Sequence, residues 1–430
     1  MANTLRRTLL LALTGIAAAL AWAAAAAEPP AEDPLAALGY EVTAGAAPGY
    51  LEDKVCATCH RDLARSFQQV GMARSFYRPR PATDIEDFGA PALVHAPSRQ
   101  RFTLRRSGER LVFRRDQEGP DGRPINVLEQ EVDWILGSGN HARTYLYRTP
   151  GGELFQLPIS WYTQTRSMGM APGYDRPDHD GVVRRVRREC MFCHNAYPQM
   201  PAGSDAHAAP QVYPPALPEG IGCQRCHGPG AEHVRRAFGG AELEPVRAAI
   251  VNPARLAPER RDEVCFQCHL QPSVALPGIV RFGRGDYSFR PGEPLAAFRL
   301  GVDVEEEDRR PEDRFEINHH PYRLRQSRCW TASPAGALSC LTCHDPHAKV
   351  PEPERAAHYR AACLTCHAED ACTGTAAHGG AVQMETADCV SCHMPQRRTQ
   401  DVVRVVMTDH RITRRAGGPE LLAPLAERDP

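Results

Sequence analysis

Alternating apolar and polar residues mark one stretch of the chain, residues 100–165, as β-structure. The stretch contains no cysteine, and five short runs of β-type composition appear in it. Turn signals separate the runs at Ser107-Gly108, Gly119–Gly122 and Pro150–Gly152. The runs are Phe102–Arg106, Leu111–Arg115, Glu129–Leu136, Arg143–Arg148 and Leu154–Leu157. We therefore predict a small antiparallel sheet, inserted into a different kind of structure.

Elsewhere the apolar positions predict only short helices joined by irregular chain. Arg61–Phe76 has helical spacing, but 38 Pro and 34 Gly residues interrupt the sequence. Aromatic residues make up only 7% of the 430 residues, which is little material for a large apolar core. The pattern indicates that something other than side chains fills part of the interior.

Residues 1–27 form a separate, strongly apolar segment. Arg6 and Arg7 precede the apolar run Leu9–Ala26, and Ala25–Ala27 resembles an A-x-A cleavage site. These features predict a signal peptide that is removed, so we expect no membrane span in the mature chain and a periplasmic or extracellular location. An uncleaved anchor is the alternative, because the run is long enough to cross a bilayer.

The pentapeptide Cys-x-x-Cys-His occurs seven times, far above what 16 Cys and 18 His in random order would produce. We number these motifs 1 to 7 in chain order. Their cysteine pairs are Cys56 with Cys59, Cys190 with Cys193, Cys223 with Cys226, Cys265 with Cys268, Cys340 with Cys343, Cys363 with Cys366, and Cys389 with Cys392. The histidines that follow them are His60, His194, His227, His269, His344, His367 and His393.

This spacing suits covalent attachment of a c-type haem. Cysteines at i and i+3 share one helical turn and can reach both vinyl groups, while the next histidine points at the iron. Zinc sites also use Cys-x-x-Cys, but they need four ligands, and here a histidine follows the second cysteine every time. We therefore predict seven covalently attached haem c groups. The predicted fold class is mainly α and irregular, a haem-packed core of short helices and long loops, with the small antiparallel β insertion around 100–165.

Eleven histidines outside the motifs could provide the second axial ligand of each iron. His141 follows a glycine-rich turn, and His233 and His347 lie just after motifs 3 and 5, from where each is expected to reach a neighbouring haem. His378, His410 and one of the adjacent pair His319 and His320 are further candidates. The remaining histidines, expected to contact solvent or propionates instead, are His95, His179, His207 and His358.

Other residues leave alternatives open. Met72 could be an axial ligand, although a methionine on an amphipathic helix more often only packs. Cys329 and Cys372 lie outside all motifs and could pair with each other or be buried separately. The basic residues are almost all Arg, which suits propionate binding, although a GC-rich genome would explain the same bias. The formal net charge of −1 gives no basic excess, so nucleic-acid binding is not expected.

We expect the chain to be organised as a signal peptide (1–27), a linker (28–50), a first haem segment (51–99), the β insertion (100–165), a six-haem region (166–415) and a C-terminal tail (416–430). The irregular intervals between the motifs do not indicate a solenoid repeat.

The chain resembles the multihaem c-type cytochromes of the doubled-CXXCH and hydroxylamine-oxidoreductase-related superfamily. The matching stretches are Gly137–His141, Pro158–Tyr162, Cys190–Pro198, Cys223–Gly230, Tyr322–Cys329, Cys340–His347 and Val406–Arg411. The resemblance implies mostly bis-histidine haems in stacked and perpendicular pairs. It favours the distal ligands His141, His233, His319, His347 and His410, with His319 preferred over His320. We expect no tetratricopeptide tail of the kind common in that group, and Arg404 stands where relatives often have His.

Two functions fit these features. The first is an extracytoplasmic heptahaem carrier that passes electrons between redox partner proteins, because irons with two histidine ligands are closed to substrates. The alternative is a multihaem oxidoreductase that acts on a small nitrogen or sulfur compound at one five-coordinate haem. Its proton-moving residues would come from Tyr162, Tyr174, Tyr197 and Arg143. No motif has the lysine-ligated form Cys-x-x-Cys-Lys, so that catalytic signature is missing.

Overall fold

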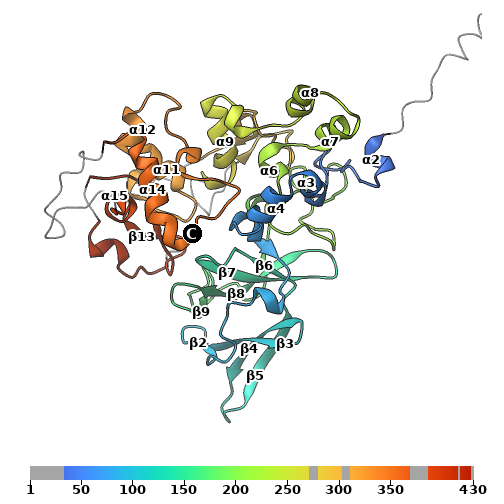
Figure 1. Ribbon diagram of the computed structural model, residues 1–430. Helices are drawn as coiled ribbons and strands as arrows, with labels where there is room; N and C mark the ends of the chain where they lie inside the picture. Colours follow the sequence, from blue (N-terminus) through green and yellow to red (C-terminus); the bar gives the residue numbers. More distant parts are fainter. Residues whose placement is uncertain (1–32, 271–278, 303–309, 369–385, 415–416, 428–430) are drawn as a thin grey trace, which may run out of the picture.

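The computed structural model describes residues 33–270, 279–302, 310–368, 386–414 and 417–427. The predicted signal peptide, Cys372 and His378 lie outside the described residues. The described chain has two parts, a β region (residues 76–185) and a motif region that carries all seven Cys-x-x-Cys-His motifs (Figure 1).

The β region consists of two antiparallel sheets. One has the strand order β1-β6-β7-β8-β10, with β9 also paired to β8, and the other has the order β2-β3-β4-β5. The strands of the first sheet are β1 (Phe76–Tyr77), β6 (Trp134–Leu136), β7 (Ala142–Arg148), β8 (Leu154–Tyr162), β9 (Ser167–Met170) and β10 (Arg184–Arg185). Those of the second are β2 (Leu93–His95), β3 (Gln100–Ser107), β4 (Arg110–Glu118) and β5 (Pro124–Glu131).

The prediction of a mainly α chain is wrong. About 30% of the structure is helix and 19% is strand, in four antiparallel sheets. The predicted runs are strands, but short strands from residues 76–95 and 167–185 join them, and the run Glu129–Leu136 divides between β5 and β6, which belong to different sheets. Two- to four-residue strands of this kind are set by tertiary pairing, so their own sequence carries no strand period.

The β region has a core made of side chains alone. Its largest cluster of buried residues includes Phe102, Phe113, Leu157 and Ile159, none more than 1% exposed. Hairpin turns connect the strands as the turn signals predict, and Gly152, between β7 and β8, has a φ of +96°, which suits glycine. This region is a conventional β fold, and it is larger than the insertion predicted from the sequence.

The motif region consists of short helices and irregular chain. Its N-terminal helices are α2 (Pro34–Ala37), α3 (Asp53–Cys59), α4 (Arg61–Phe67), α5 (Arg188–His194), α6 (Gln224–His227), α7 (Ala231–Phe238), α8 (Leu243–Ala248), α9 (Pro258–His269) and α10 (Leu295–Phe298). Its C-terminal helices are α11 (His320–Arg325), α12 (Arg328–Ala332), α13 (Cys340–Cys343), α14 (Arg355–Leu364) and α15 (Cys389–His393). Two-stranded sheets join β11 (Ile279–Val280) to β12 (Arg299–Leu300) and β13 (Gln396–Arg398) to β14 (Val406–Thr408).

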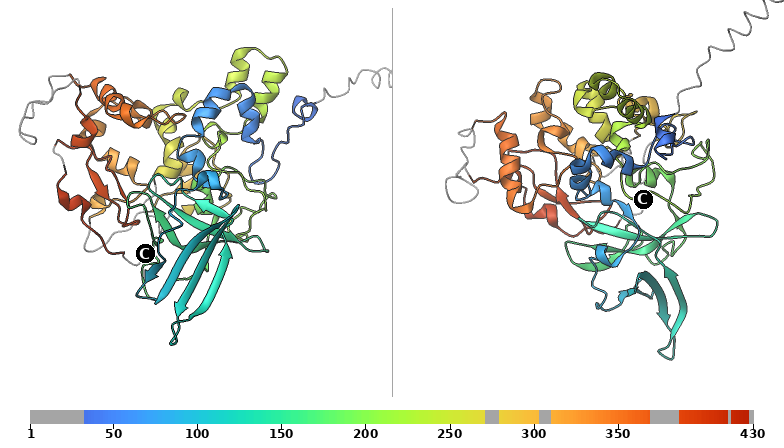
Figure 2. Two further views of the ribbon diagram at one scale, coloured as in Figure 1. Left: turned by 60° about the horizontal axis from the view of Figure 1, so that its bottom comes forward. Right: turned by 45° about the vertical axis from the view of Figure 1, so that its right-hand side comes forward.

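Segments far apart in the sequence lie side by side in this region. Helices α3 and α4, from the first haem segment, pack beside α6 and α7, as the views in Figures 1 and 2 show. The predicted linker takes part in this packing: Leu35 of α2 is buried with Val55 of α3 and Val234 of α7, and the Asp33 carboxylate accepts hydrogen bonds from Arg235. The chain therefore brings motif 1 against motif 3, across the whole β region in sequence.

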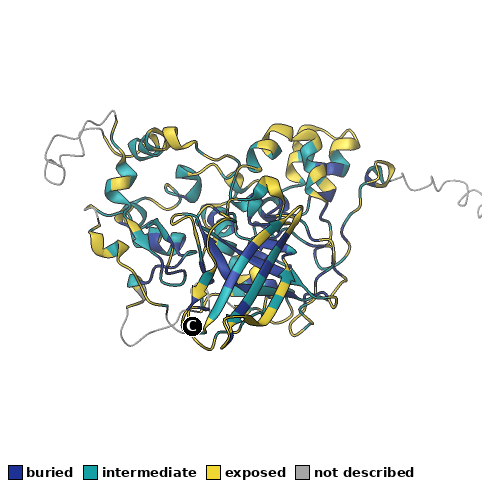
Figure 3. Cartoon of the chain, turned by 90° about the horizontal axis from the view of Figure 1, so that it is seen from below, coloured by how far each residue is buried: buried dark blue, intermediate teal, exposed yellow. Residues whose placement is uncertain are grey.

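Burial differs sharply between the two parts. Figure 3 shows buried residues concentrated in the strands of the β region, whereas the motif helices carry mostly intermediate and exposed residues. None of the helices within the described ranges is both long and apolar enough to cross a bilayer.

Candidate haem sites

Each motif is held by one turn of helix or by a helix end. Motif 5 occupies α13, motif 7 occupies α15, and motifs 2 and 4 lie at the C-terminal ends of α5 and α9. A backbone hydrogen bond from the motif histidine to the first cysteine closes the turn at 2.9 to 3.1 Å in motifs 1, 3, 5 and 6 (His60 to Cys56, His227 to Cys223, His344 to Cys340, His367 to Cys363). The two sulfurs of a motif therefore share one helical turn, as attachment to both vinyl groups requires.

The second cysteine of three motifs lies beside the hydroxyl group of the residue before it. In motif 7, where Cys389 begins α15 and Cys392 is in its last turn, the Ser391 hydroxyl is 4.0 Å from the sulfur of Cys392. The corresponding distances are 3.8 Å from Thr58 to Cys59 in motif 1 and 3.7 Å from Thr365 to Cys366 in motif 6. Cys392 is only partly buried, and Cys59 and Cys366 are exposed, so their sulfurs remain accessible for attachment.

Four motif histidines face a second histidine from elsewhere in the chain. The centroid separations are 6.3 Å for His60 and His233, 5.9 Å for His227 and His347, 6.2 Å for His269 and His320, and 6.2 Å for His344 and His410. The first two pairs are nearly parallel, at 21° and 12°. Motifs 1, 3, 4 and 5 are thus each reached by a different distal histidine, which comes from another part of the chain.

These separations fit one iron between each pair of rings. First-row metals bind imidazole nitrogen at about 2.0 Å, and the nitrogen lies about 1.1 Å from the ring centre, so two axial imidazoles should have centroids about 6 Å apart. His320 and His410, which belong to two different pairs, lie closer together, at 4.4 Å and with a tilt of 45° between the rings. The residues present therefore fit haem at these four motifs.

Backbone carbonyls orient several of these imidazoles. Nδ1 of His227 donates to the Val251 carbonyl at 2.7 Å, and Nδ1 of His233 donates to the Val246 carbonyl at 2.9 Å. Nδ1 of His393 in motif 7 donates in the same way to Thr413, at 2.7 Å. A carbonyl can only accept, so in the neutral ring the proton is on Nδ1 and Nε2 keeps the lone pair that a metal needs.

Burial keeps the imidazoles neutral. Loss of solvent lowers the pKa of His194 in motif 2 to about 4, and it lowers the pKa of His410 to about 4 as well. Burial also lowers the pKa values of His227, His269 and His344. Since only the unprotonated ring binds a metal, this environment favours ligation at neutral pH.

Three of the predicted distal histidines lie at motif histidines, namely His233, His347 and His410. His319 does not; its Nε2 atom lies 3.6 Å from a Glu316 carboxylate oxygen and its ring packs on Tyr322. His320 takes the place opposite His269. The two side chains point in different directions where α11 begins. The resemblance favoured His319, whereas the structure places His320 opposite the histidine of motif 4.

His141 is partly buried in the loop between β6 and β7, and the pKa of its ring is lowered, first by burial and then by the charge of Arg355. No histidine of motifs 1 to 7 stacks on its ring among the described contacts. Met72 lies in a short 3-10 turn (Met72–Arg74), where its carbonyl accepts a hydrogen bond from Ile221. The ligand roles of His141 and Met72 remain predictions.

Histidines expected not to be ligands are engaged by the protein. His95 contacts Ser98 through Nδ1 and Asp175 through Nε2, at 2.8 and 3.2 Å. His179 accepts a hydrogen bond from the Gly181 amide, and Nε2 of His358 lies 3.2 Å from the Cys343 carbonyl.

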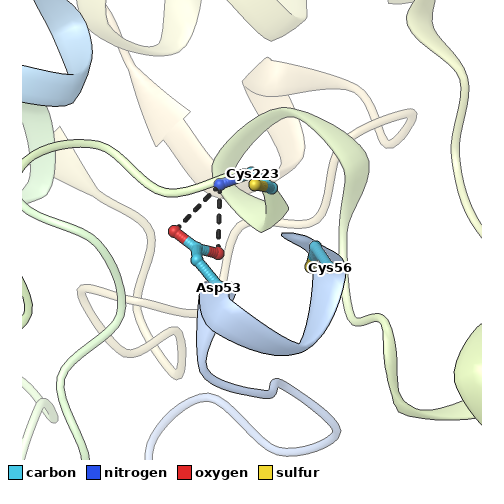
Figure 4. Close-up of side chains that lie close together, drawn as sticks. All are labelled: Asp53, Cys56 and Cys223. Carbon is cyan, nitrogen blue, oxygen red and sulfur yellow. Dashed lines mark hydrogen bonds between the residues drawn. The ribbon is translucent and has the colours of Figure 1, made fainter. Parts of the chain in front are cut away.

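Cysteines of different motifs also meet. The sulfurs of Cys56 and Cys223, in motifs 1 and 3, lie within 4.8 Å of each other and of an Asp53 carboxylate oxygen. The Asp53 carboxylate accepts two hydrogen bonds from the Cys223 amide and so ties α3 to α6 (Figure 4). Both sulfurs belong to Cys-x-x-Cys-His motifs, so the cluster marks the place where motifs 1 and 3 meet.

The same contact recurs between other motifs. Three further pairs of thiols from different motifs lie close enough for one to raise the pKa of the other: Cys268 acts on Cys193 (motifs 4 and 2), Cys340 on Cys265 (motifs 5 and 4) and Cys389 on Cys363 (motifs 7 and 6). The sequence does not indicate which cysteines of different motifs lie together, because the partners are far apart in the chain; Cys56 and Cys223 are separated by 167 residues.

The four residues considered for proton transfer are all used structurally. The hydroxyl groups of Tyr162, Tyr174 and Tyr197 donate to the carbonyls of Met170, Gln156 and Phe289. Arg143 is 2% exposed and binds the Glu86 carboxylate and the Tyr77 hydroxyl. These side chains stabilise the β region and its border with the motif helices.

The family described as the doubled CXXCH motif matches residues 333–371, which contain motifs 5 and 6. Neither the curated proteins nor the solved structures contain a match. The match and the repeated motif support a protein of the multihaem c-type cytochrome kind, in which Cys-x-x-Cys-His motifs bind haem c covalently. The matched residues do not include motifs 1 to 4 or motif 7, so the full count of seven haems, with the seventh at Cys389 and Cys392, stays a prediction.

Proposed function

We propose that this protein is an exported heptahaem cytochrome c that carries electrons along closely packed, mostly bis-histidine haems. We place it with the hydroxylamine-oxidoreductase-related group of doubled-CXXCH cytochromes. The observation that carries the proposal is the set of four histidine pairs at 5.9 to 6.3 Å. An iron with two histidine ligands has no free position for a substrate, so it can change oxidation state but cannot bind and transform a small molecule.

The contacts between motifs support a continuous path for electrons. The thiols of motifs 1 and 3 lie within 4.8 Å of each other, and thiols of motifs 2 and 4, 4 and 5, and 6 and 7 are close enough to affect one another's pKa. Cys268 lies close enough to Cys226 to raise its pKa, which connects motif 4 to motif 3. Cys343 likewise raises the pKa of Cys363, which connects motif 5 to motif 6. The proposed order is therefore 1-3-4-5-6-7, with motif 2 as a branch at motif 4.

Arg225, inside motif 3, supports a propionate-binding role for arginine. It is 2% exposed, stacks 4.0 Å above the Phe192 ring and donates to the Phe192 carbonyl. Its Nε and one terminal nitrogen have no hydrogen-bond partner in the described part of the chain. A buried guanidinium with unused N–H groups is costly unless an acceptor is present, and a haem propionate is an acceptor of the right charge.

The oxidoreductase alternative has less support. Its candidate residues Tyr162, Tyr174, Tyr197 and Arg143 each bind protein groups, so none offers a free hydroxyl or guanidinium to a substrate. Export through the apolar segment 1–27 would place the carrier in the periplasm or outside the cell, where we expect it to exchange electrons with donor and acceptor proteins.

The adjacent histidines of α11 provide the test. We expect mass spectrometry of the wild-type protein to find seven covalent haems, and the reduced protein to bind little carbon monoxide. His320→Ala should open one iron and add about one equivalent of carbon monoxide binding per chain, because His269 would lose its partner. His319→Ala is the matched control and should leave the haem spectrum unchanged.

Two results would contradict the proposal. Fewer than seven haems would disprove the count, and stoichiometric carbon monoxide binding by the wild-type protein would favour the oxidoreductase. If His319→Ala opened an iron and His320→Ala did not, the assignment of the ligand at motif 4 would be wrong.

A further inference from the structure

Cys329 lies outside the seven motifs, yet its sulfur is directed at a motif histidine. The Sγ atom is 4.0 Å from Nε2 of His367 in motif 6. Nε2 is the atom that the iron takes wherever Nδ1 donates to a carbonyl, as in motifs 3 and 7. The Cys329 thiol therefore contacts the nitrogen through which His367 would bind the iron of motif 6.

The separation fits a metal between the two atoms. First-row metals bind imidazole nitrogen at about 2.0 Å and thiolate sulfur at about 2.3 Å, so ligands on opposite sides of one iron are about 4.3 Å apart. The four histidine pairs meet the corresponding expectation for two imidazoles. Motif 6 differs from them in presenting sulfur in place of a second ring.

The backbone around Cys329 is fixed by its neighbours. Ser327, 1% exposed, precedes α12; its hydroxyl donates to the His410 carbonyl and accepts from the Ile412 amide. The Ser333 hydroxyl donates to the carbonyl of Cys329 itself. Cys329 is thus attached to the segment that carries His410, the partner of motif 5, and projects from there towards motif 6.

Nearby histidines are engaged elsewhere. Nε2 of His358 contacts the Cys343 carbonyl, and the ring of His347 faces His227 of motif 3. Among the residues that the structure describes, Cys329 is the one whose side chain contacts the Nε2 atom of His367.

We propose that the Cys329 thiolate is the sixth ligand of the haem attached at Cys363 and Cys366, opposite His367. A thiolate adds electron density and negative charge to the iron, which stabilises the ferric state. Motif 6 would then have a lower potential than the bis-histidine sites. Since it lies between motifs 5 and 7, electrons that reach motif 7 would cross a step of low potential. This inference rests on haem attachment at motif 6, which the proposed function includes.

The test is spectroscopic and uses the full-length holoprotein. Electron paramagnetic resonance and near-infrared magnetic circular dichroism of the ferric protein should show one low-spin haem with thiolate ligation per chain. Cys329→Ala should lose that signal and gain one high-spin haem. Cys329→His should convert the signal to the bis-histidine type and shift one midpoint potential upwards. Cys372→Ala, the matched control at the other non-motif cysteine, should change nothing.

Several outcomes would overturn the proposal: no thiolate signal in the wild-type protein, an unchanged spectrum in Cys329→Ala, or a disulfide between Cys329 and Cys372 found by mass spectrometry. If His378→Ala lost one low-spin haem while Cys329→Ala left the spectrum unchanged, the sixth ligand of motif 6 would be His378 instead. The haem count and the response of His320→Ala are measured independently, so failure of the carrier proposal is distinguishable from failure of this ligand assignment.

Discussion

The β region and the motif region differ in what fills their interiors. In the β region, large side chains such as Phe102, Phe113 and Tyr145 are almost completely buried against one another. In the motif region, α12, α13, α14 and α15 contain no buried residue at all, although they carry motifs 5 and 7 and most of motif 6. The motif region has side-chain clusters around α3 and α7 and around α5, but its C-terminal helices α12 to α15 bury none of their residues.

The comparison explains the low aromatic content of the chain. A core of packed side chains needs aromatic and branched residues, whereas a haem is itself a large apolar body that can replace them. Helices of four to ten residues, such as α13 and α14, are too short to be stable alone. We therefore expect the C-terminal part of the motif region to depend on bound haem for its stability, and the β region not to.

The two regions are nevertheless connected at the ligand-bearing segments. The Gln164 side chain donates to the Val406 carbonyl and accepts from the Val406 amide, which fixes β14 just before His410. Tyr162 packs with Val402 and Val405 at the same border. The β region thus acts as a rigid support that positions one of the distal histidines.

The largest expected effect comes from preventing haem attachment. In the full-length chain produced without cytochrome c maturation, we expect α12 to α15 of the motif region to unfold because these helices bury no residue, while residues 76–185 keep their strands. Far-ultraviolet circular dichroism should show loss of helix with retention of strand, and limited proteolysis should leave a protected fragment from the β region. Retention of the helical signal would show that the motif region folds on its own residues.

A smaller effect is expected from the buried ion pair of the β region. Arg143→Met leaves the Glu86 carboxylate buried without its partner, which should lower the free energy of unfolding by about 3 kcal/mol. The haem spectrum should not change, because Arg143 binds protein groups only. Denaturant unfolding monitored by circular dichroism measures the first effect, and the Soret band measures the second.

The exposed pair Arg105 and Glu129 provides the control for that experiment. Arg105→Met should change stability by less than about 1 kcal/mol, because surface ion pairs contribute little. If Arg143→Met altered carbon monoxide binding while leaving stability intact, Arg143 would belong to a substrate site and the oxidoreductase alternative would gain support.

The smallest effect concerns Asp401, in the turn between β13 and β14. Burial, with the charge of Glu316 as a second cause, raises its pKa from the usual value of 3.8 to about 7. Between these two values the unfolded chain releases the proton and the folded protein retains it. Stability associated with this group is therefore present below pH 4 and is lost as the pH rises to 7.

Asp401→Asn removes that dependence. We expect the variant to have a melting temperature higher than the wild type by roughly 3 °C at pH 8 and about equal to it at pH 4. Thermal melts at the two pH values, with haem content held constant, check the sign. A variant less stable than the wild type at pH 8 would show that the carboxylate makes a stabilising contact in its ionised form.

Much of the chemistry was predictable from local sequence. The seven motifs, the strands around residues 100–165 and the distal candidates His233, His347 and His410 all follow from spacing or resemblance over short stretches. The fold class was not predictable from local sequence, because two-residue strands such as β1 and β10 form only through pairing with distant partners. The size of the β region was underestimated for the same reason.

The sequence by itself determined which residues can attach haem, since a thioether pair and its histidine lie within one helical turn. Only the tertiary structure decided what stands on the other side of each iron. His320 faces His269, while its neighbour His319 lies against Glu316. The direction in which the chain enters α11 decides which of the two side chains points at motif 4. Cys329 meets His367 across 38 residues, a contact that no local pattern contains. Axial ligation joins residues far apart in the chain, so packing selects among candidates that are chemically equivalent in the sequence.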